Sequence, residues 1–447
     1  MYILTNGRLI TRDPDARGYY EKGAVVYEGS KIVEVGEEAA LTAKYPQAEK
    51  IDAKGGVIMP ALINAHTHIY SALARGLSIV GNNPTNFLEV LEGTWWAIDR
   101  HLTLEGTRAS ADALYIDCIK QGVTTVFDHH ASYCQIPGSL FQIGESAKKF
   151  GIRSCLCYEV SDRDGEEKCL EAIRENADWI TYCRERNDPM LAAMFGGHAL
   201  FTISDKTFDR MVEANNGRTG YHIHVSEGMN DVYDSLQNYG RRPVQRLQDH
   251  GILGEKTILG HCIHVNTAEM ELIRETGTMV VNNPESNMGN AIGICPVLQL
   301  YKRGILLGMG TDAYTNDMLE SLKVALCSQR SQNCLPNVGW CEVTDMLFKN
   351  NAKIGEKYFP DTLGVLKAGA AADIIVMDYK PFTPFSDENI DGHMIFGMTG
   401  RQCQTTIAAG KLLMKDRELV GIDEEAENAH ILEASRKLWG TLNHREY

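Results

Sequence analysis

The sequence predicts an α/β protein: a (β/α)8 TIM barrel joined to a small β-sandwich domain that is built from both chain ends. From residue 57 onward, short apolar runs alternate with amphipathic helical stretches, the rhythm of a parallel sheet with crossover helices. Eight such runs fit within roughly 300 residues, which is typical of a TIM barrel. Both ends of the chain instead show short strands joined by turns, which predicts a separate sheet.

The first segment has the pattern of a sheet. Residues 2–11 alternate between apolar and polar side chains. Residues 24–28 and 31–35 flank Gly29-Ser30, a two-residue turn suited to a β-hairpin. We therefore expect residues 1–56 to form strands of the small domain.

The barrel strands are predicted from the eight apolar runs. Helical patterns lie between most of them, such as residues 114–121 before Gly122 and residues 267–276 before Gly277. A glycine at that place suits the left-handed residue that ends many helices. The eight predicted strands cover residues 57–64, 123–128, 152–158, 190–196, 220–225, 257–259, 278–281 and 305–309.

The sheet pattern returns after residue 363. Short strands are predicted over residues 373–377, 405–408, 410–413 and 418–420, and helical spacing follows over residues 424–442. We therefore expect a small β domain from residues 1–56 and 364–422, a barrel over residues 57–363, and a C-terminal helix within residues 423–447.

Composition excludes several classes of partner. The chain has 447 residues and a formal net charge of −15, which repels nucleic-acid phosphates and anionic membranes. We expect no nucleic-acid and no membrane partner, since no run of eighteen apolar residues occurs either. Residues 1–13 lack the basic and then apolar pattern of a secretory signal peptide, so we expect a cytoplasmic protein. The twelve cysteines are scattered along the chain, and we expect them to be reduced thiols.

Polar residues at the predicted strand ends form a coherent set. TIM barrels carry their active sites at the carboxyl ends of the strands. His66 and His68 end the first strand, and alternation along a strand directs both imidazoles to one side. His224, His261 and Asp312 follow the fifth, sixth and eighth strands. Three of these histidines together with the carboxylate would suit one divalent ion, zinc most readily and iron as the alternative.

Each of these residues also has a simpler interpretation. A histidine can be a hydrogen-bonded structural residue, Asp312 can be the N-cap of the following helix, and Glu227 can be a solvated carboxylate in a first helical turn. Their joint position at the strand ends favours a metal-dependent active site instead.

The same residues carry a family resemblance over nearly the whole chain. The set resembles the amidohydrolase superfamily, and GGVIMPALINAH (55–66) and LGVLKAGAAADIIV (363–376) look like its passages into and out of the barrel. The chain is similar to the aminohydrolase and chlorohydrolase branch, which includes guanine, 8-oxoguanine and S-adenosylhomocysteine deaminases, triazine hydrolases and a group labelled SsnA. The matching segments are HVSE (224–227), GHCIH (260–264), NPESN (283–287) and GTD (310–312).

The resemblance implies the roles of the central residues. His66, His68, His224 and Asp312 would hold the metal, while Glu227, His261 and Asp312 would be catalytic. Members with two ions bridge them by a carboxylated lysine after the fourth strand. That strand ends here at His198, with no lysine, so one ion is predicted.

Substrate contacts are predicted from position in this branch. His198 ends the fourth strand, and of His129 and His130 after the second strand we favour His130. Trp95, beside Trp96 on the long segment after the first strand, would supply an aromatic wall for a flat ring. Ser71 stands where guanine and 8-oxoguanine deaminases often carry a glutamine, which leaves the exact ring open.

The predicted function is hydrolytic deamination of a small nitrogen heterocycle, a purine- or pyrimidine-like base, with release of ammonia. The HxxE spacing of His224 and Glu227 favours deamination, which needs protonation of a ring nitrogen. Chloride release from a triazine and hydrolysis of a cyclic amide are alternatives on the same scaffold. A non-catalytic binding protein is a remote alternative. A homodimer is a further expectation for this branch.

Overall fold

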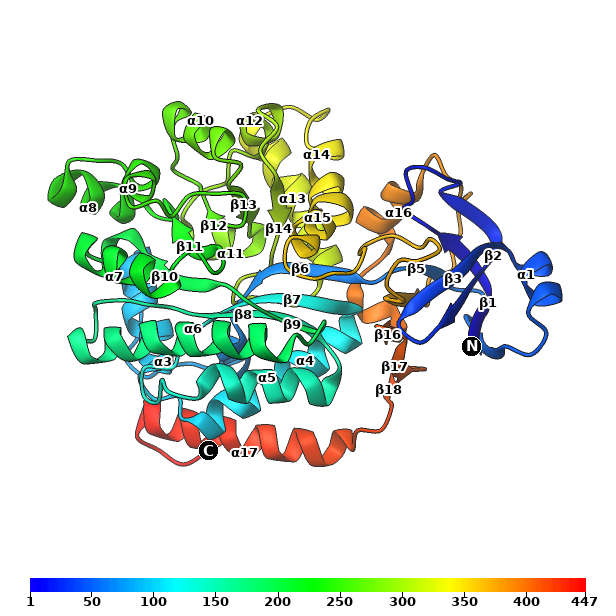
Figure 1. Cartoon of the computed structure of the whole chain (residues 1–447), viewed down its shortest axis with the longest axis horizontal. Coiled ribbons are helices and arrows are strands. Elements are labelled where there is room, and N and C mark those ends of the chain that lie inside the picture. Colours follow the sequence, from blue (N-terminus) through cyan, green and yellow to red (C-terminus); the bar gives the residue numbers. More distant parts are fainter.

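The computed structural model describes residues 1–447 and contains a closed barrel of parallel strands (Figure 1). The bridge between Thr67 and Asp312 joins the last strand to the first, and the bridge between Val160 and Gly197 joins the two halves. The predicted (β/α)8 barrel is therefore confirmed. Its strands are β6 (Leu62–Thr67), β7 (Val123–His130), β8 (Arg153–Tyr158), β9 (Leu191–Ala193), β10 (Phe195–Ala199), β11 (Tyr221–Val225), β12 (Ile258–His261), β13 (Met279–Asn282) and β14 (Leu307–Met309).

Two of the predicted strands are divided in the structure. The run from residue 57 contains β5 (Val57–Pro60), which pairs with the terminal sheet, and only β6 enters the barrel. The expected barrel start at residue 57 is thus too early, and β6 begins at Leu62. The run over residues 190–196 divides into β9, paired with β8, and β10, paired with β11. Because both parts of each run are buried and apolar, hydrophobicity gives no sign of the division.

Helices cover the outside of the barrel (Figure 1). Gly122 has φ 77° directly after α4, and Gly277 has φ 67° two residues after α10, so both predicted helix ends have the left-handed backbone that glycine favours. The helices of the barrel region are α2 (Phe87–Val90), α3 (Trp96–Asp99), α4 (Leu104–Gln121), α5 (Ser139–Phe150), α6 (Glu166–Arg186), α7 (Asp205–Asn215), α8 (Met229–Tyr239), α9 (Pro243–Asp249), α10 (Thr267–Glu275), α11 (Pro284–Gly289), α12 (Val297–Lys302), α13 (Met318–Asn333), α14 (Trp340–Asp345) and α15 (Asn351–Glu356).

Strands from both chain ends pair in one hydrogen-bonded sheet, at the right of Figure 1, as expected for a small β domain built from both ends. Their order is β18-β17-β16-β15-β5-β1-β2-β3, and β4 pairs with β1. The N-terminal and C-terminal parts meet where β5 pairs antiparallel with β15. The strands are β1 (Tyr2–Ile10), β2 (Tyr19–Glu28), β3 (Lys31–Glu37), β4 (Glu49–Asp52), β15 (Ile374–Met377), β16 (Cys403–Ala408), β17 (Lys411–Lys415) and β18 (Glu418–Leu419); α1 (Glu38–Lys44) and α16 (Ile390–Gly397) accompany them.

A buried ion pair connects the barrel to this sheet. Arg153, the first residue of β8, has a fully buried side chain and pairs with Asp373, which directly precedes β15. Its guanidinium also donates to Thr125 Oγ1 at 3.2 Å. Because both charges have lost their water, each depends on the other for compensation.

Arg153→Met is expected to lower the free energy of unfolding by about 3–5 kcal/mol, since Asp373 keeps a buried charge without its partner. Urea denaturation of the zinc-loaded protein measures the loss. Arg210→Met is the matched control because the Arg210–Glu166 pair lies at the surface, and its loss of stability should be much smaller. Equal losses in the two variants would contradict the structural role of Arg153.

The C-terminal helix α17 (Glu424–Asn443) agrees with the helical spacing predicted over residues 424–442. It runs along the lower edge of the barrel in Figure 1. Trp439 Nε1 donates to Leu73 O at 2.7 Å, and Asn443 Nδ2 donates to Ser78 O at 3.0 Å. The helix thereby holds the segment that follows His66 and His68, including the 3₁₀ helix η1 (Ile69–Ala74).

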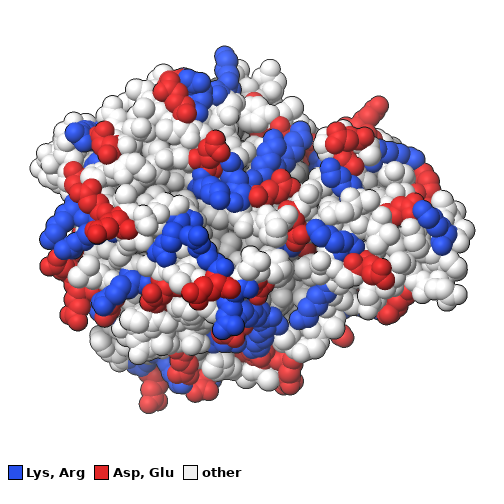
Figure 2. All heavy atoms as spheres, in the orientation of Figure 1, with Lys and Arg blue, Asp and Glu red and all other residues white.

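Figure 2 shows acidic and basic side chains interspersed over one face of the molecule. All twelve cysteines are free thiols, as predicted. Nowhere does the chain form a helix with the length and apolar character needed to span a membrane.

Candidate metal centre and active site

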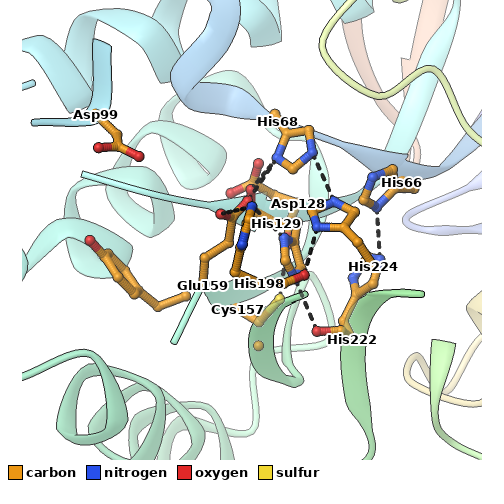
Figure 3. A network of polar contacts seen from close by, with 12 residues as sticks. His66, His68, Asp99, Asp128, His129, Cys157, Glu159, His198, His222 and His224 are labelled. Carbon is orange, nitrogen blue, oxygen red and sulfur yellow. Dashed lines mark hydrogen bonds and ion pairs between the residues drawn. The ribbon is translucent and has the colours of Figure 1, made fainter. Parts of the chain in front are cut away.

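Four of the predicted residues meet at the carboxyl end of the barrel. His66, His68, His224 and Asp312 are buried, and one ligand atom of each lies within 4.8 Å of the others. Figure 3 shows the three imidazoles pointing toward one another from β6 and β11. Strands that are distant in sequence thus place four donors around one point.

Backbone carbonyl groups orient two of these imidazoles. His68 Nδ1 lies 2.6 Å from His129 O, and His224 Nδ1 lies 2.8 Å from His198 O. A carbonyl accepts only, so each Nδ1 carries the ring proton and each Nε2 presents a lone pair. The two Nε2 atoms face each other at 3.2 Å. Two facing lone pairs repel, whereas a cation between them would be bound by both.

The remaining two donors complete the same set. His66 Nε2 is buried without a hydrogen-bond partner, and its Nδ1 lies 2.8 Å from His222 Nε2. Asp312 Oδ1 lies 2.9 Å from His68 Nε2 and 3.7 Å from His66 Nε2. An unpartnered buried nitrogen beside a carboxylate fits a metal ligand. Three imidazole nitrogens and one carboxylate oxygen therefore fit a zinc-type ion.

Asp312 is held in place by the barrel and not by a helix. Its backbone N–H donates to His66 O at 3.0 Å, and its Oδ2 accepts a hydrogen bond from Ser286 Oγ at 2.5 Å. The N-cap of α13 is Asp317, so the alternative interpretation of Asp312 as a cap is wrong. Burial opposes ionisation of Asp312, but His66 and His68 outweigh it and hold its pKa well below the usual range.

Glu227 and His261 lie beside Asp312. His261 Nε2 is 3.5 Å from both Glu227 Oε1 and Asp312 Oδ2. His261 Nδ1 lies 2.7 Å from Asn287 Oδ1, which accepts its proton and leaves Nε2 as an acceptor. Burial first, and then the charge of Asp312, raises the pKa of Glu227 well above its usual value. The pKa values of these two neighbouring carboxyl groups are thus shifted in opposite directions, which suits separate base and acid roles.

A small cavity lies over these groups. Two tryptophans from the long segment after β6 supply much of its apolar wall. Aromatic walls with a few converging polar groups suit a flat ring. The lining residues are His68, Tyr70, Phe87, Leu91, Trp95, Trp96, Glu159, His198, His224, Glu227, Ser286, Asn290, Asp312 and Ala313.

The predicted substrate contacts divide into two groups. His198 and Trp95 line the cavity, and so does Trp96. Ser71 lies outside this lining: its Oγ donates to His68 O at 2.7 Å, and it faces an adjoining pocket. His130 also lies outside it, with Nε2 3.0 Å from Ser132 Oγ. Ser71 therefore supports the backbone of a metal ligand, and His130 packs behind the cavity.

The sequence interpretation missed several neighbours of the metal centre. His129, and not His130, faces the barrel interior, because alternation along β7 places adjacent residues on opposite sides. Glu159 Oε1 accepts a hydrogen bond from His129 Nδ1 at 2.9 Å (Figure 3). His222 contacts His66 from the strand that carries His224. Glu159 follows β8 directly, so the strand-end rule could have found it.

Glu285 in the NPESN segment is a half-buried carboxyl group outside the cavity lining. Its Oε1 accepts a hydrogen bond from Ser321 Oγ at 2.8 Å. Burial raises the pKa of Glu285 from 4.5 to about 7. Between these pH values the folded chain holds a proton that the unfolded chain has released. The contribution of Glu285 to stability therefore falls as the pH rises through this range.

Glu285→Gln is expected to remove this pH dependence, because glutamine has no proton to lose. At pH 4.5 the variant and the wild type should have nearly equal free energies of unfolding. At pH 8 the free energy of unfolding of the variant should be higher by on the order of 1–3 kcal/mol. Urea denaturation at both pH values measures the difference. Both proteins share the same metal ligands, so metal-linked effects cancel. An equal difference at the two pH values would contradict the expectation.

Comparisons with known proteins identify the family of the chain. The model of the amidohydrolase family matches residues 57–413, and that of the imidazolonepropionase-like composite domain of bacteria matches residues 23–48. The chain is 30% identical to 5'-deoxyadenosine deaminase from Methanosarcina mazei over 99% of both chains. It is 31% identical to 5-methylthioadenosine/S-adenosylhomocysteine deaminase from Thermococcus sibiricus, over 88% of this chain and 90% of that protein.

Solved structures share the fold. An adenosine deaminase from Xanthomonas campestris with bound zinc superimposes with a TM-score of 0.85 at 22% identity, over 98% of both chains. Guanine deaminase from E. coli superimposes with a TM-score of 0.79 at 19% identity, over 93% of this chain and 100% of that one. Together, the family match, the full-length relatives and the converging histidines lead to one conclusion. The chain belongs to the amidohydrolase family.

Proposed function

We propose that this protein is a metal-dependent hydrolytic deaminase that removes an amino group from a small nitrogen heterocycle as ammonia. One observation carries the proposal: residues of the four-donor metal site and the Glu227 carboxyl group, whose pKa burial raises, line the same cavity. Water attack and proton delivery can then take place on the same bound ring. The relatives named above are deaminases, which supports the same reaction.

The proposed cofactor is one divalent ion, zinc in preference to iron, held by His66, His68, His224 and Asp312. Bound there, the ion would supply a water molecule acidic enough to lose a proton near neutral pH. The orienting carbonyl groups behind His68 and His224 fix the ligand nitrogens in advance.

Three side chains divide the proton transfers. Asp312 is ionised and accepts a proton from the attacking water. His261 Nε2 accepts a hydrogen bond from the same water and holds it against the ring. Glu227 donates its proton to the ring nitrogen beside the attacked carbon, which breaks the aromatic system and stabilises the tetrahedral adduct.

The second half of the reaction breaks the carbon–nitrogen bond. The proton that Asp312 accepted passes to the amino group, directly or by way of Glu227, and ammonia leaves with the bonding electron pair. The hydroxyl proton of the adduct returns to Glu227, so the carbon keeps the oxygen as a carbonyl and one water is consumed for each ammonia released. Chloride needs no such proton, so the placement of Glu227 favours an amine as leaving group. A non-catalytic scaffold is disfavoured because all four donors are present.

An ammonia-coupled assay of the zinc-loaded protein tests the proposal. The panel contains guanine, isocytosine, 5'-deoxyadenosine, a chlorotriazine and a cyclic amide. We expect ammonia in equal amount to the amino heterocycle consumed. Chloride release or ring opening without ammonia would overturn deamination in favour of the alternative reactions. The cytoplasmic location, the homodimer and the absence of nucleic-acid and membrane partners remain predictions.

A further inference from the structure

Glu159 is a carboxylate in the cavity that the deamination steps leave unused. Its side chain is 3% exposed and lines the cavity beside His198. Its Oε1 accepts a hydrogen bond from His129 Nδ1 at 2.9 Å and lies 3.3 Å from His68 Nδ1. Its Oε2 lies 4.0 Å from His198 Nε2, too far for a hydrogen bond. One oxygen is therefore anchored, and the other remains available to a ligand.

The anchoring of Glu159 keeps it charged. His129 Nε2 lies 2.9 Å from His222 O, so both ring nitrogens of His129 face acceptors and both donate. Glu159 Oε1 accepts one of these two protons in an ion pair with His129. Glu159 thus presents an anionic acceptor to the cavity.

His198 presents a second acceptor. Its Nδ1 lies 2.8 Å from Thr202 Oγ1, and that hydroxyl donates its own proton to Ala199 O at 3.0 Å. Thr202 must therefore accept the proton of His198 Nδ1, which leaves a lone pair on Nε2. The ring of Trp96 lies edge-on to His198 at 5.9 Å and borders the same space. Two acceptors, Glu159 Oε2 and His198 Nε2, thus lie 4.0 Å apart at the cavity wall.

We propose that Glu159 and His198 form a two-acceptor recognition edge that selects rings with N–H donors, such as oxo- and amino-substituted purines and pyrimidines, over adenine derivatives. The ring nitrogens of a 9-substituted adenine are acceptors only, and its one amino group lies at the reacting carbon. Such a ring would place lone pairs against Glu159 and His198. This inference rests on the proposed deamination and narrows its substrate class.

A second metal ion is the competing interpretation of this cluster, because His68, His129, Glu159 and His224 are close enough to share one. However, His68 and His224 each have one nitrogen bonded to a carbonyl and the other at the first metal site. Only His129 Nδ1 and Glu159 remain, and they already bond to each other. Hydrogen bonding to a substrate is the better-supported role.

The test uses the full-length, zinc-loaded protein and xanthine, a ring with several N–H donors and no amino group to lose. Glu159→Gln should weaken xanthine binding by about tenfold or more and raise KM for guanine with little change in kcat. Glu159→Asp keeps the charge but shortens the side chain, which moves the oxygens away from the ligand. This variant should therefore lose less xanthine affinity than Glu159→Gln. Glu285→Gln, which alters a half-buried carboxyl group outside the cavity lining, should leave xanthine binding unchanged.

The outcomes separate this inference from the proposed function. Faster ammonia release from 5'-deoxyadenosine than from guanine would overturn the recognition edge and leave deamination intact. Xanthine binding that is unmeasurable in wild type or unchanged by Glu159→Gln would also overturn it. Two zinc ions per chain, falling to one in Glu159→Gln, would assign Glu159 to a metal site instead. Glu159-dependent xanthine binding without ammonia from any substrate would uphold the edge and refute the deaminase.

Discussion

Glu227→Gln is expected to reduce kcat by about 10²–10⁴-fold while the protein keeps its full zinc content. Glutamine has nearly the size of glutamic acid, so the cavity should keep its shape. It cannot deliver a proton to the ring nitrogen, and the four donors that suit the ion do not include Glu227. Ammonia release under saturating substrate and zinc per chain, measured on the same preparation, give the two quantities.

The zinc measurement matters because Glu227, His261 and Asp312 are themselves close enough to share an ion. Loss of zinc in Glu227→Gln would show that Glu227 is a ligand and that the four-donor site is wrong. Turnover within a few-fold of wild type would show that another group supplies the proton. Glu285→Gln serves as the control, because it removes a carboxyl group with a raised pKa that does not line the cavity.

The barrel could be predicted because each strand is a short apolar run with its own polar boundary. The strand β5 could not be separated from β6, because only the pairing of Ile374 with Pro60 shows where the chain changes sheets. That contact joins residues more than 300 positions apart in the sequence. Local hydrophobicity contains no information about it.

The metal ligands could be predicted because a general rule places them at strand ends. His66, His68, His224 and Asp312 each follow an apolar run, and the structure brings all four together. The same rule applied to the third strand would have found Glu159, which directly follows β8. It was missed because it matches no motif of the resembled branch and its role depends on His129 and His198 across the barrel.

The side chains around the ligands were harder to predict. Alternation along Tyr221–Val225 places His222 on the same side as His224, but only the structure shows its contact with His66. The choice between His129 and His130 required knowledge of which side of β7 faces the barrel interior. Ser71 follows His68 by three residues, a spacing that suits a turn as well as a substrate contact. Such residues depend on tertiary packing, which a spacing rule does not describe.

Removal of the ion is expected to abolish turnover. It should also lower the free energy of unfolding by about 4 kcal/mol, compared with protein kept at a free zinc concentration about 1,000 times the Kd for zinc. Without the ion, His68 Nε2 and His224 Nε2 still face each other at 3.2 Å, and the repulsion of their lone pairs is uncompensated. Relief requires one of them to bind a proton, which adds charge to a buried cluster of histidines. Chelation followed by thermal and urea denaturation, with and without added zinc, measures the effect.

His224→Asn identifies the site through which zinc stabilises the protein. This substitution removes one of the two facing nitrogens, so added zinc should no longer raise the stability of the chelated variant, and turnover should stay lost. His250→Asn is the matched control, because His250 contacts Asp209 at 2.8 Å far from the four donors and should leave the zinc response intact. If His224→Asn responded to zinc as strongly as wild type, the ion would be bound elsewhere, and water activation by these four side chains could not be the basis of the reaction.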